Sequence, residues 1–132
     1  MIRALAALLL LAATPASAPP KPAITVSFLE PAGHIKIGEQ RVELSVDGKA
    51  SETPLTIGGS VEGFRLRTVS RDVKVNGENP GVWCELTILA KDGSEAGYLA
   101  VTFPNAAAGA SAATKFKGAK GAPIAAVVTR AP

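Results

Sequence analysis

The sequence has few of the side chains on which catalysis and metal binding depend. It contains one cysteine (Cys84), one histidine (His34) and one methionine, which is the initiator Met1. A single cysteine excludes a disulfide within the chain. A single histidine excludes a metal site built from several histidines, and one methionine excludes methionine-based copper transport. The sequence therefore predicts a protein that is not an enzyme and that uses no metal or cofactor.

Long apolar runs and a strong excess of one charge are also missing. The longest apolar run covers residues 4–13, which is shorter than the roughly 20 residues of a transmembrane helix. The formal net charge is only +3, with 14 basic and 11 acidic residues. Nucleic-acid-binding proteins carry a strongly basic stripe. We therefore expect neither a transmembrane segment nor a nucleic-acid partner.

The N-terminus has the pattern of a secretory signal peptide. Arg3 precedes the apolar run, and the small residues of Thr14-Pro15-Ala16-Ser17-Ala18 follow it. A positive start, a short apolar stretch and a small-residue exit are typical of such leaders. We expect residues 1–18 to be a signal peptide. Cleavage after Ala18 meets the obstacle of Pro19, and cleavage after Ala16 is the alternative.

The predicted compartment is the bacterial periplasm or the medium. A small eukaryotic secreted scaffold is usually rich in disulfides, which this chain cannot form internally. The sequence also contains no N-x-S/T glycosylation site, and its leader is rich in alanine. These features favour a bacterial envelope or secreted protein.

Apolar and polar residues alternate with a period of two through most of residues 22–104, which we expect to form one β-domain. The alternating segments are residues 24–28, 35–37, 42–46, 55–57, 64–67, 69–75, 82–90 and 99–103. Strands that recur between turn-forming residues are typical of an antiparallel sandwich. The prediction is an all-β fold, an antiparallel immunoglobulin-like β-sandwich of about seven or eight strands. A small closed β-barrel is the alternative.

Two local patterns within this domain predict irregular backbone. Asp47-Gly48 lies between alternating segments, which is a strong signal for a hairpin turn. Phe64 and Leu66 occupy even positions, whereas the next valines occupy odd positions. A slip of one residue sends side chains to the other face of a strand. We therefore expect a bulge or turn within residues 68–72.

The C-terminal part of the sequence has a different composition. Residues 105–122 are almost all Ala, Gly, Ser, Thr and Lys, and we expect a flexible linker because they offer little apolar surface to bury. Residues 123–132 are expected to form a C-terminal strand and tail. The apolar part, residues 123–129, is expected to pair with its own sheet, along the strand that contains Ile24. The alternative is exchange of this strand between copies, which would build a fibre or a swapped dimer.

Cys84 is expected to be buried and inert. It shares its parity with Val82, Leu86 and Ile88, so it points to the apolar side of its strand, and free cysteine is among the most buried residue types. A disulfide to another chain is the alternative. A catalytic pair of Cys84 and His34 would need an exposed thiol, so His34 is interpreted as a surface residue.

Four residues are candidates for a binding surface. Trp83 has the opposite parity to Cys84, and Tyr98 is placed to join it. Arg65 and Arg67 share one strand face. Exposed aromatic residues are typical anchors for sugars and protein partners. The simpler interpretations are that Trp83 caps one end of the core and that the arginines belong to an ordinary solvated face.

These features together predict a small exported β-domain without enzymatic activity. The expected partner is an envelope protein or a glycan. The alternative function is that of a structural subunit that self-associates by C-terminal strand exchange.

Overall fold

The computed structural model describes residues 21–30, 35–75, 77–104 and 111–131. The elements are β1 (Ala23–Glu30), β2 (Ile35–Glu43), β3 (Ser51–Pro54), the short 3-10 helix η1 (Gly59–Val61), β4 (Arg65–Val75), β5 (Asn79–Leu89), β6 (Glu95–Pro104), β7 (Ser111–Lys117) and β8 (Pro123–Arg130). The all-β prediction is confirmed. The predicted signal peptide and His34 lie outside the described residues.

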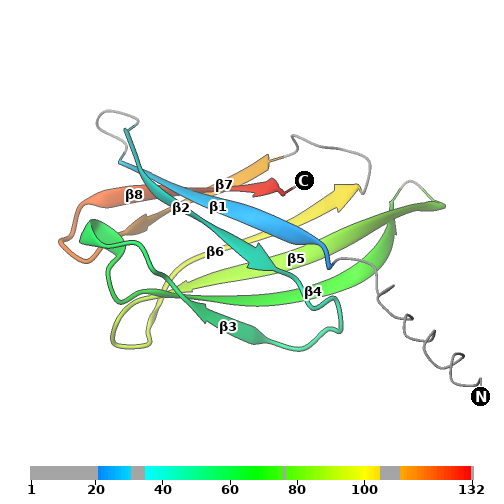
Figure 1. The fold of residues 1–132 in the computed structure, drawn as a ribbon, viewed down its shortest axis with the longest axis horizontal. Coiled ribbons are helices and arrows are strands. Elements are labelled where there is room, and N and C mark those ends of the chain that lie inside the picture. Colours follow the sequence, from blue (N-terminus) through cyan, green and yellow to red (C-terminus); the bar gives the residue numbers. More distant parts are fainter. Residues whose placement is uncertain (1–20, 31–34, 76, 105–110, 132) are drawn as a thin grey trace, which may run out of the picture.

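The strands form two antiparallel sheets of four strands each, as Figure 1 shows. One sheet has the order β2-β1-β8-β7, and the other has the order β3-β4-β5-β6. The alternating apolar residues of both sheets meet in one buried cluster. Its largest fully buried members are Phe28, Phe103, Ile24, Leu44, Leu66, Leu86, Ile88 and Ile124. This arrangement is sandwich-like, with the core between the two sheets.

The connectivity differs from that of an immunoglobulin domain. Within each sheet, neighbouring strands follow one another in the sequence, apart from the pairing of β8 with β1. Immunoglobulin sandwiches instead place strands from distant parts of the chain side by side. Consecutive neighbours are the order of an up-and-down barrel. Here the ring of strands is interrupted at two seams, between β2 and β3 and between β6 and β7.

At each seam the strands are not hydrogen-bonded to each other, and a glycine on one side packs against a large side chain on the other. A Cβ atom at Gly38 would lie 2.7 Å from Cγ2 of Ile57, and one at Gly97 would lie 3.0 Å from Cβ of Phe116. At the first seam, the Gln40 amide also donates to the carbonyl of Pro54 at 2.9 Å. The predicted strand at residues 55–57 is therefore wrong. Those residues cover the edge of β2, and β3 ends just before them.

The predicted bulge within residues 68–72 is also wrong. β4 pairs with β5 in continuous register from Arg65 to Val75. Thr68 and Ser70 take the core-facing positions and are buried, whereas Val69 points to the other face. The apolar residues move from even to odd positions in the sequence, although the backbone of β4 continues without a bulge.

The predicted hairpin at Asp47-Gly48 does not form. β2 and β3 belong to different sheets, so residues 44–50 cross from one sheet to the other. The backbone N–H of Gly48 donates to the carbonyl of Ser70 at 2.8 Å. The turn-forming pair therefore directs the chain onto β4 and does not return it beside β2.

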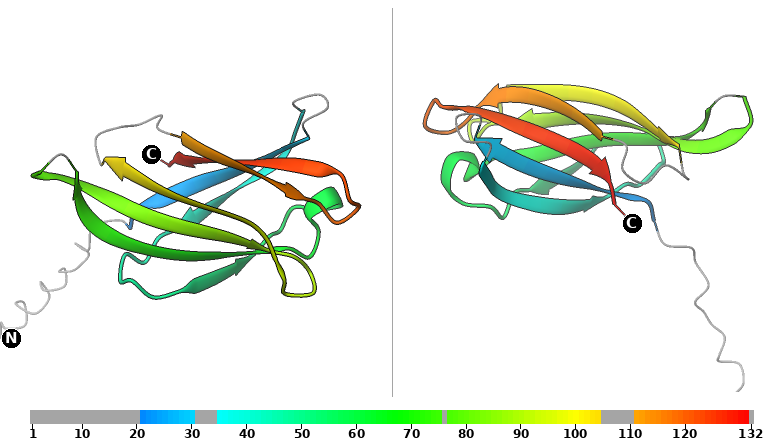
Figure 2. Two further views of the ribbon diagram at one scale, coloured as in Figure 1. Left: turned by 180° about the vertical axis from the view of Figure 1, so that it is seen from behind. Right: turned by 90° about the horizontal axis from the view of Figure 1, so that it is seen from above.

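The C-terminal part of the chain is integral to the fold. The predicted flexible linker is wrong for residues 111–117, which form β7 and pair with β8 throughout. β8 in turn pairs with β1, where Ile24 lies opposite Arg130. Figure 2 shows β7 and β8, orange and red, side by side in one sheet. The C-terminal strand thus pairs within its own chain in this structure, and the domain extends well beyond residue 104.

Candidate binding surface

The four predicted binding residues lie on one surface, the outward side of sheet β3-β4-β5-β6. We call this surface the outer face. Trp83 and Tyr98 occupy it on β5 and β6, and Arg65 and Arg67 occupy it on β4, because their partners in the strand register share one side of the sheet. Trp83 is half-buried and is not part of the core cluster.

Trp83 is covered by an arginine that the sequence analysis did not select. Arg71 lies opposite Trp83 in the register of β4 and β5. Its guanidinium carbon is 5.4 Å from the centroid of the Trp83 ring, which is a cation–π distance. Arg71 is exposed and forms no ion pair with any residue that the structure describes. The outer face therefore presents a cation that lies over an indole ring.

The crossing segment, residues 44–50, holds Arg71 in place. Asp47 forms a β-bridge with Arg71, and the N–H of Val46 donates to Oγ of Ser70 at 2.9 Å. A Cβ atom at Gly48, whose φ is +78°, would lie 3.2 Å from Nε of Arg71. Glycine at this position leaves room for the arginine side chain to reach Trp83.

Val46 adopts an unusual backbone conformation in the same segment. Its φ is 52°, which for a β-branched residue is a genuine outlier. Such a conformation costs about 1–2 kcal/mol. The hydrogen bond from Val46 to Ser70 and the packing of Val46 against the core offset this cost. Strain is therefore stored beside Arg71.

Tyr98 lies further along the outer face. Its side chain is 45% exposed, and its hydroxyl donates to Oε2 of Glu85 at 2.5 Å. The hydrogen bond to Glu85 raises the pKa of Tyr98. The contact orients the phenol ring and leaves much of it open to solvent.

Arg65 and Arg67 share a carboxylate. Glu52 on β3 lies 3.2 Å from Nε of Arg65 and 3.4 Å from an Nη atom of Arg67. All three side chains are partly exposed, and exposed pairs contribute little to stability. The two predicted arginines are therefore largely neutralised, whereas Arg71 forms no ion pair with a described residue.

Sequence reasoning missed Arg71 and Glu85 because their roles depend on strand pairing. The position of Trp83 in the alternating pattern predicted which face of the strand it occupies. Only the strand register places Arg71 opposite it. The register also places Glu85 near Tyr98, because Tyr98 lies opposite Thr87 and Glu85 lies two residues before Thr87 on the same face of β5. An arginine near a turn carries no signal of this kind in the sequence.

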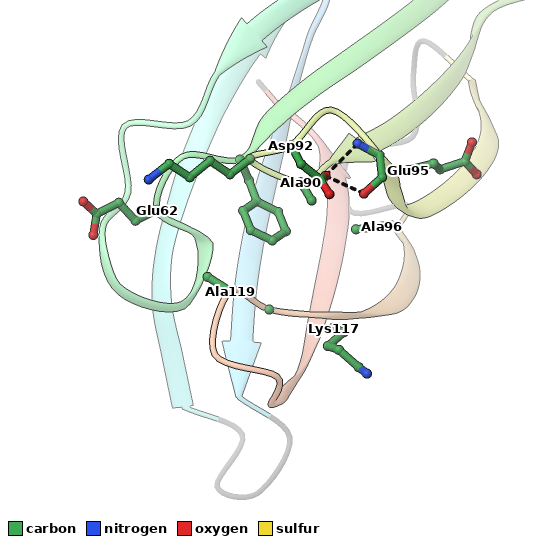
Figure 3. Close-up of a pocket in the computed structure, with 11 residues that line it drawn as sticks. Glu62, Ala90, Asp92, Glu95, Ala96, Lys117 and Ala119 are labelled. Carbon is green, nitrogen blue, oxygen red and sulfur yellow. Dashed lines mark hydrogen bonds between the residues drawn. The ribbon is translucent and has the colours of Figure 1, made fainter.

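A hollow of about 580 Å³ opens at one end of the sandwich, between η1, the β5–β6 turn and the β7–β8 turn. Figure 3 shows that Glu95 and Lys117 carry their charged ends away from it, while Ala90, Ala96 and Ala119 line it. Binding pockets usually combine apolar walls with a few converging polar groups. Such convergence is not seen among the labelled side chains here, so we favour the outer face as the functional surface.

Burial and local hydrogen bonds shift the pKa values of three further groups. Cys84 is 0% exposed, and burial raises its pKa from 9.0 to about 11. The pKa of Asp47 is lowered by the N–H of Lys49 and the hydroxyl of Ser45, and that of Asp92 by the hydroxyl and N–H of Ser94. Among the described residues, no group of three His, Cys, Asp or Glu side chains is placed to hold a metal ion.

Comparison of the chain with protein-family models, curated proteins and solved structures gives no match. In the described part of the chain, no helix has the length and hydropathy to cross a membrane. The interpretation of function therefore rests on the outer face itself.

Proposed function

We propose that the protein is an exported β-domain without enzymatic activity, and that its outer face binds a protein of the bacterial envelope. The observation that carries this proposal is the exposed Arg71, whose guanidinium lies over the ring of Trp83, with Tyr98 on the same face. Tryptophan, tyrosine and arginine are the residue types that contribute most to protein–protein binding energy. Both aromatic rings are oriented by contacts within the domain, so little conformational entropy is lost on binding.

A glycan is the second candidate ligand. Sugars stack on exposed aromatic rings, and Tyr98 offers such a ring. However, the guanidinium of Arg71 already lies over Trp83 at 5.4 Å, so a sugar would have to displace it from that side. A protein partner with an acidic side chain would instead use Arg71 where it stands.

The proposal is tested by comparing what the wild-type protein and two variants retain from a solubilised envelope. Wild-type protein and the control variant Ile35→Ala are expected to capture the same partner, because Ile35 is 61% exposed on the other sheet. Trp83→Ala is expected to lose it, with a dissociation constant at least about 30-fold higher, as for a typical hot-spot residue. Thermal melting of each variant shows whether the fold is intact.

Trp83 also provides a direct signal, because it is the only tryptophan in the chain. Addition of the purified partner is expected to shift its fluorescence, and Arg71→Gln is expected to weaken binding and reduce its salt dependence. Equal capture by folded Trp83→Ala would refute the outer face as the binding surface. A fluorescence response to envelope polysaccharide, with no captured protein, would show that the ligand is a glycan.

A further inference from the structure

Glu85 occupies a central position on the outer face, between two possible partners for its carboxylate. It lies opposite Val69 of β4 on one side and opposite Ala100 of β6 on the other. Arg71 is therefore its diagonal neighbour on β4, and Tyr98 is its diagonal neighbour on β6. Diagonal neighbours in a sheet are about 7–8 Å apart, which is within the reach of long side chains. The Glu85 carboxylate can thus reach either residue.

In the structure, the Glu85 carboxylate is bonded to Tyr98. The Tyr98 hydroxyl donates to Oε2 of Glu85 at 2.5 Å. Arg71 forms no ion pair with any residue in the described ranges, and its guanidinium lies over Trp83. The carboxylate is therefore directed across the sheet toward β6, although a guanidinium lies within reach on β4.

The other arginine near Glu85 already has a carboxylate partner. Arg67 is also a diagonal neighbour of Glu85 on β4, but its guanidinium lies 3.4 Å from Oε2 of Glu52. A Glu85 side chain that lost its bond to β6 would meet no such competitor at Arg71. Arg71 is therefore the cation that Glu85 would neutralise.

We propose that Tyr98 is a positioning residue of the outer face, whose hydroxyl holds the Glu85 carboxylate away from Arg71 and so keeps Arg71 available for a carboxylate of the partner. This inference rests on the proposed function, because it names the group of the partner that Arg71 binds. Guanidinium and carboxylate groups form strong charge-assisted hydrogen bonds. Without the Tyr98 hydroxyl, Glu85 would compete with the partner for the same guanidinium.

The balance between the two positions of the Glu85 carboxylate depends on the Tyr98 hydroxyl. A hydrogen bond to a charged group contributes more to stability than an ion pair between exposed side chains. Glu85 is half-buried and Arg71 is exposed, so solvent would screen an ion pair between them. The hydroxyl therefore favours the observed position. Its removal leaves Arg71 as the better partner of Glu85.

The first test needs no binding partner, because Trp83 is the only tryptophan in the chain. Iodide quenches tryptophan fluorescence by collision, and a cation beside the ring raises the local concentration of this anion. Acrylamide is a neutral quencher, so it reports the exposure of the ring alone. The ratio of the iodide and acrylamide quenching constants therefore measures the charge beside Trp83. Arg71→Gln provides the low reference value for this ratio.

Tyr98→Phe removes only the hydroxyl and is expected to lower the ratio toward that of Arg71→Gln, because Glu85 then neutralises Arg71. The double variant Tyr98→Phe/Glu85→Gln is expected to restore the ratio. The matched control is Tyr98→Phe/Glu95→Gln, which removes an equal charge and is expected to leave the ratio low. Glu95 is exposed at the start of the same strand, roughly 20 Å along the sheet from Trp83.

Two results would overturn the proposal. An unchanged ratio in folded Tyr98→Phe would show that Glu85 does not move to Arg71. Equal restoration by Glu85→Gln and Glu95→Gln would show that the ratio follows only the net charge of the protein. Thermal melting shows that each variant is folded, which is expected because Tyr98 is 45% exposed.

Binding of the captured envelope partner provides the second test. Tyr98→Phe is expected to raise the dissociation constant about 2–5-fold, because the partner must first break an exposed ion pair between Arg71 and Glu85. Glu85→Gln is expected to cancel most of this loss in the double variant. A loss that Glu85→Gln does not restore would show that the Tyr98 hydroxyl contacts the partner directly, which would overturn the positioning role.

The two proposals fail separately. Quenching needs no partner, so it tests the position of Glu85 alone. If Tyr98→Phe lowers the quenching ratio but binds the partner like the wild type, the role of Tyr98 toward Glu85 stands and a partner carboxylate at Arg71 is refuted. If Trp83→Ala loses the partner but Tyr98→Phe leaves the ratio unchanged, the outer face stands and the role of Tyr98 is refuted.

Discussion

At the scale of single residues, two buried hydroxyl groups explain why β4 is difficult to interpret from its sequence. Thr68 and Ser70 face the core, where polar atoms are costly unless they are hydrogen-bonded. Ser70 Oγ meets this condition by accepting from the N–H of Val46. A pattern analysis that counts only apolar residues assigns the core side to Val69 and Val73. It therefore predicts a bulge where the strand is continuous.

Cys84 leads to a prediction about alkaline pH. Burial raises its pKa from 9.0 to about 11, because the core disfavours the thiolate. A raised folded-state pKa gives stability that is complete below pH 9 and is lost as the pH rises through 11. We expect this thiol to account for roughly 2–3 kcal/mol of the loss in unfolding free energy over that range.

Urea unfolding of wild-type protein and Cys84→Ala at several pH values from neutral to about 11 checks this expectation. The variant is expected to be less stable at neutral pH but to lose less stability as the pH rises. Part of the slope remains, because the pKa of the Tyr98 hydroxyl is also raised. Parallel curves for the two proteins would show that Cys84 does not contribute.

At the scale of elements, β7 and β8 show how a strand depends on its neighbours. Residues 111–117 contain one large apolar side chain, Phe116, and alone would not offset their ordering entropy. β8 supplies backbone hydrogen-bond partners along the whole of β7, and the ring of Phe116 packs against Phe28 and Phe64. An edge strand needs little apolar surface of its own when the sheet already exists.

The position of β8 between β1 and β7 predicts opposite results for two adjacent valines. Val128 is fully buried, whereas Val127 is half-buried on the outward side of the sheet. Val128→Asp is expected to prevent folding, because an unpaired carboxylate in the core costs several kcal/mol. Val127→Asp is expected to fold, with a lower melting temperature. Circular dichroism and thermal melting measure both outcomes.

The same pair of variants tests the exchange of the C-terminal strand. A tail that leaves its own domain would not require Val128 for folding of that domain. A folded, monomeric Val128→Asp protein would therefore contradict the integral role of β8.

At the scale of the whole molecule, the prediction of export depends on residues 1–18, which lie outside the described residues. The leader pattern of residues 1–18 predicts removal after Ala16 or Ala18. When the full-length chain is produced in a bacterium, we expect to find the protein in the periplasm or the medium. Its intact mass is expected to match a chain that begins at Ser17 or Pro19. Leu9→Arg, which interrupts the apolar run, is expected to retain the full-length chain inside the cell. Export of unprocessed wild-type protein would contradict the signal-peptide assignment.

The sequence by itself determined the fold class and most strands, because alternation with a period of two follows directly from the geometry of a pleated strand. It also separated Cys84 from Trp83, since adjacent residues point to opposite faces. Tertiary structure decided which strands are neighbours, that residues 44–50 change sheets, and that β7 is ordered. It also placed Arg71 over Trp83. These features depend on contacts between segments that are distant in the chain, and parity within one strand carries no information about the partner of that strand.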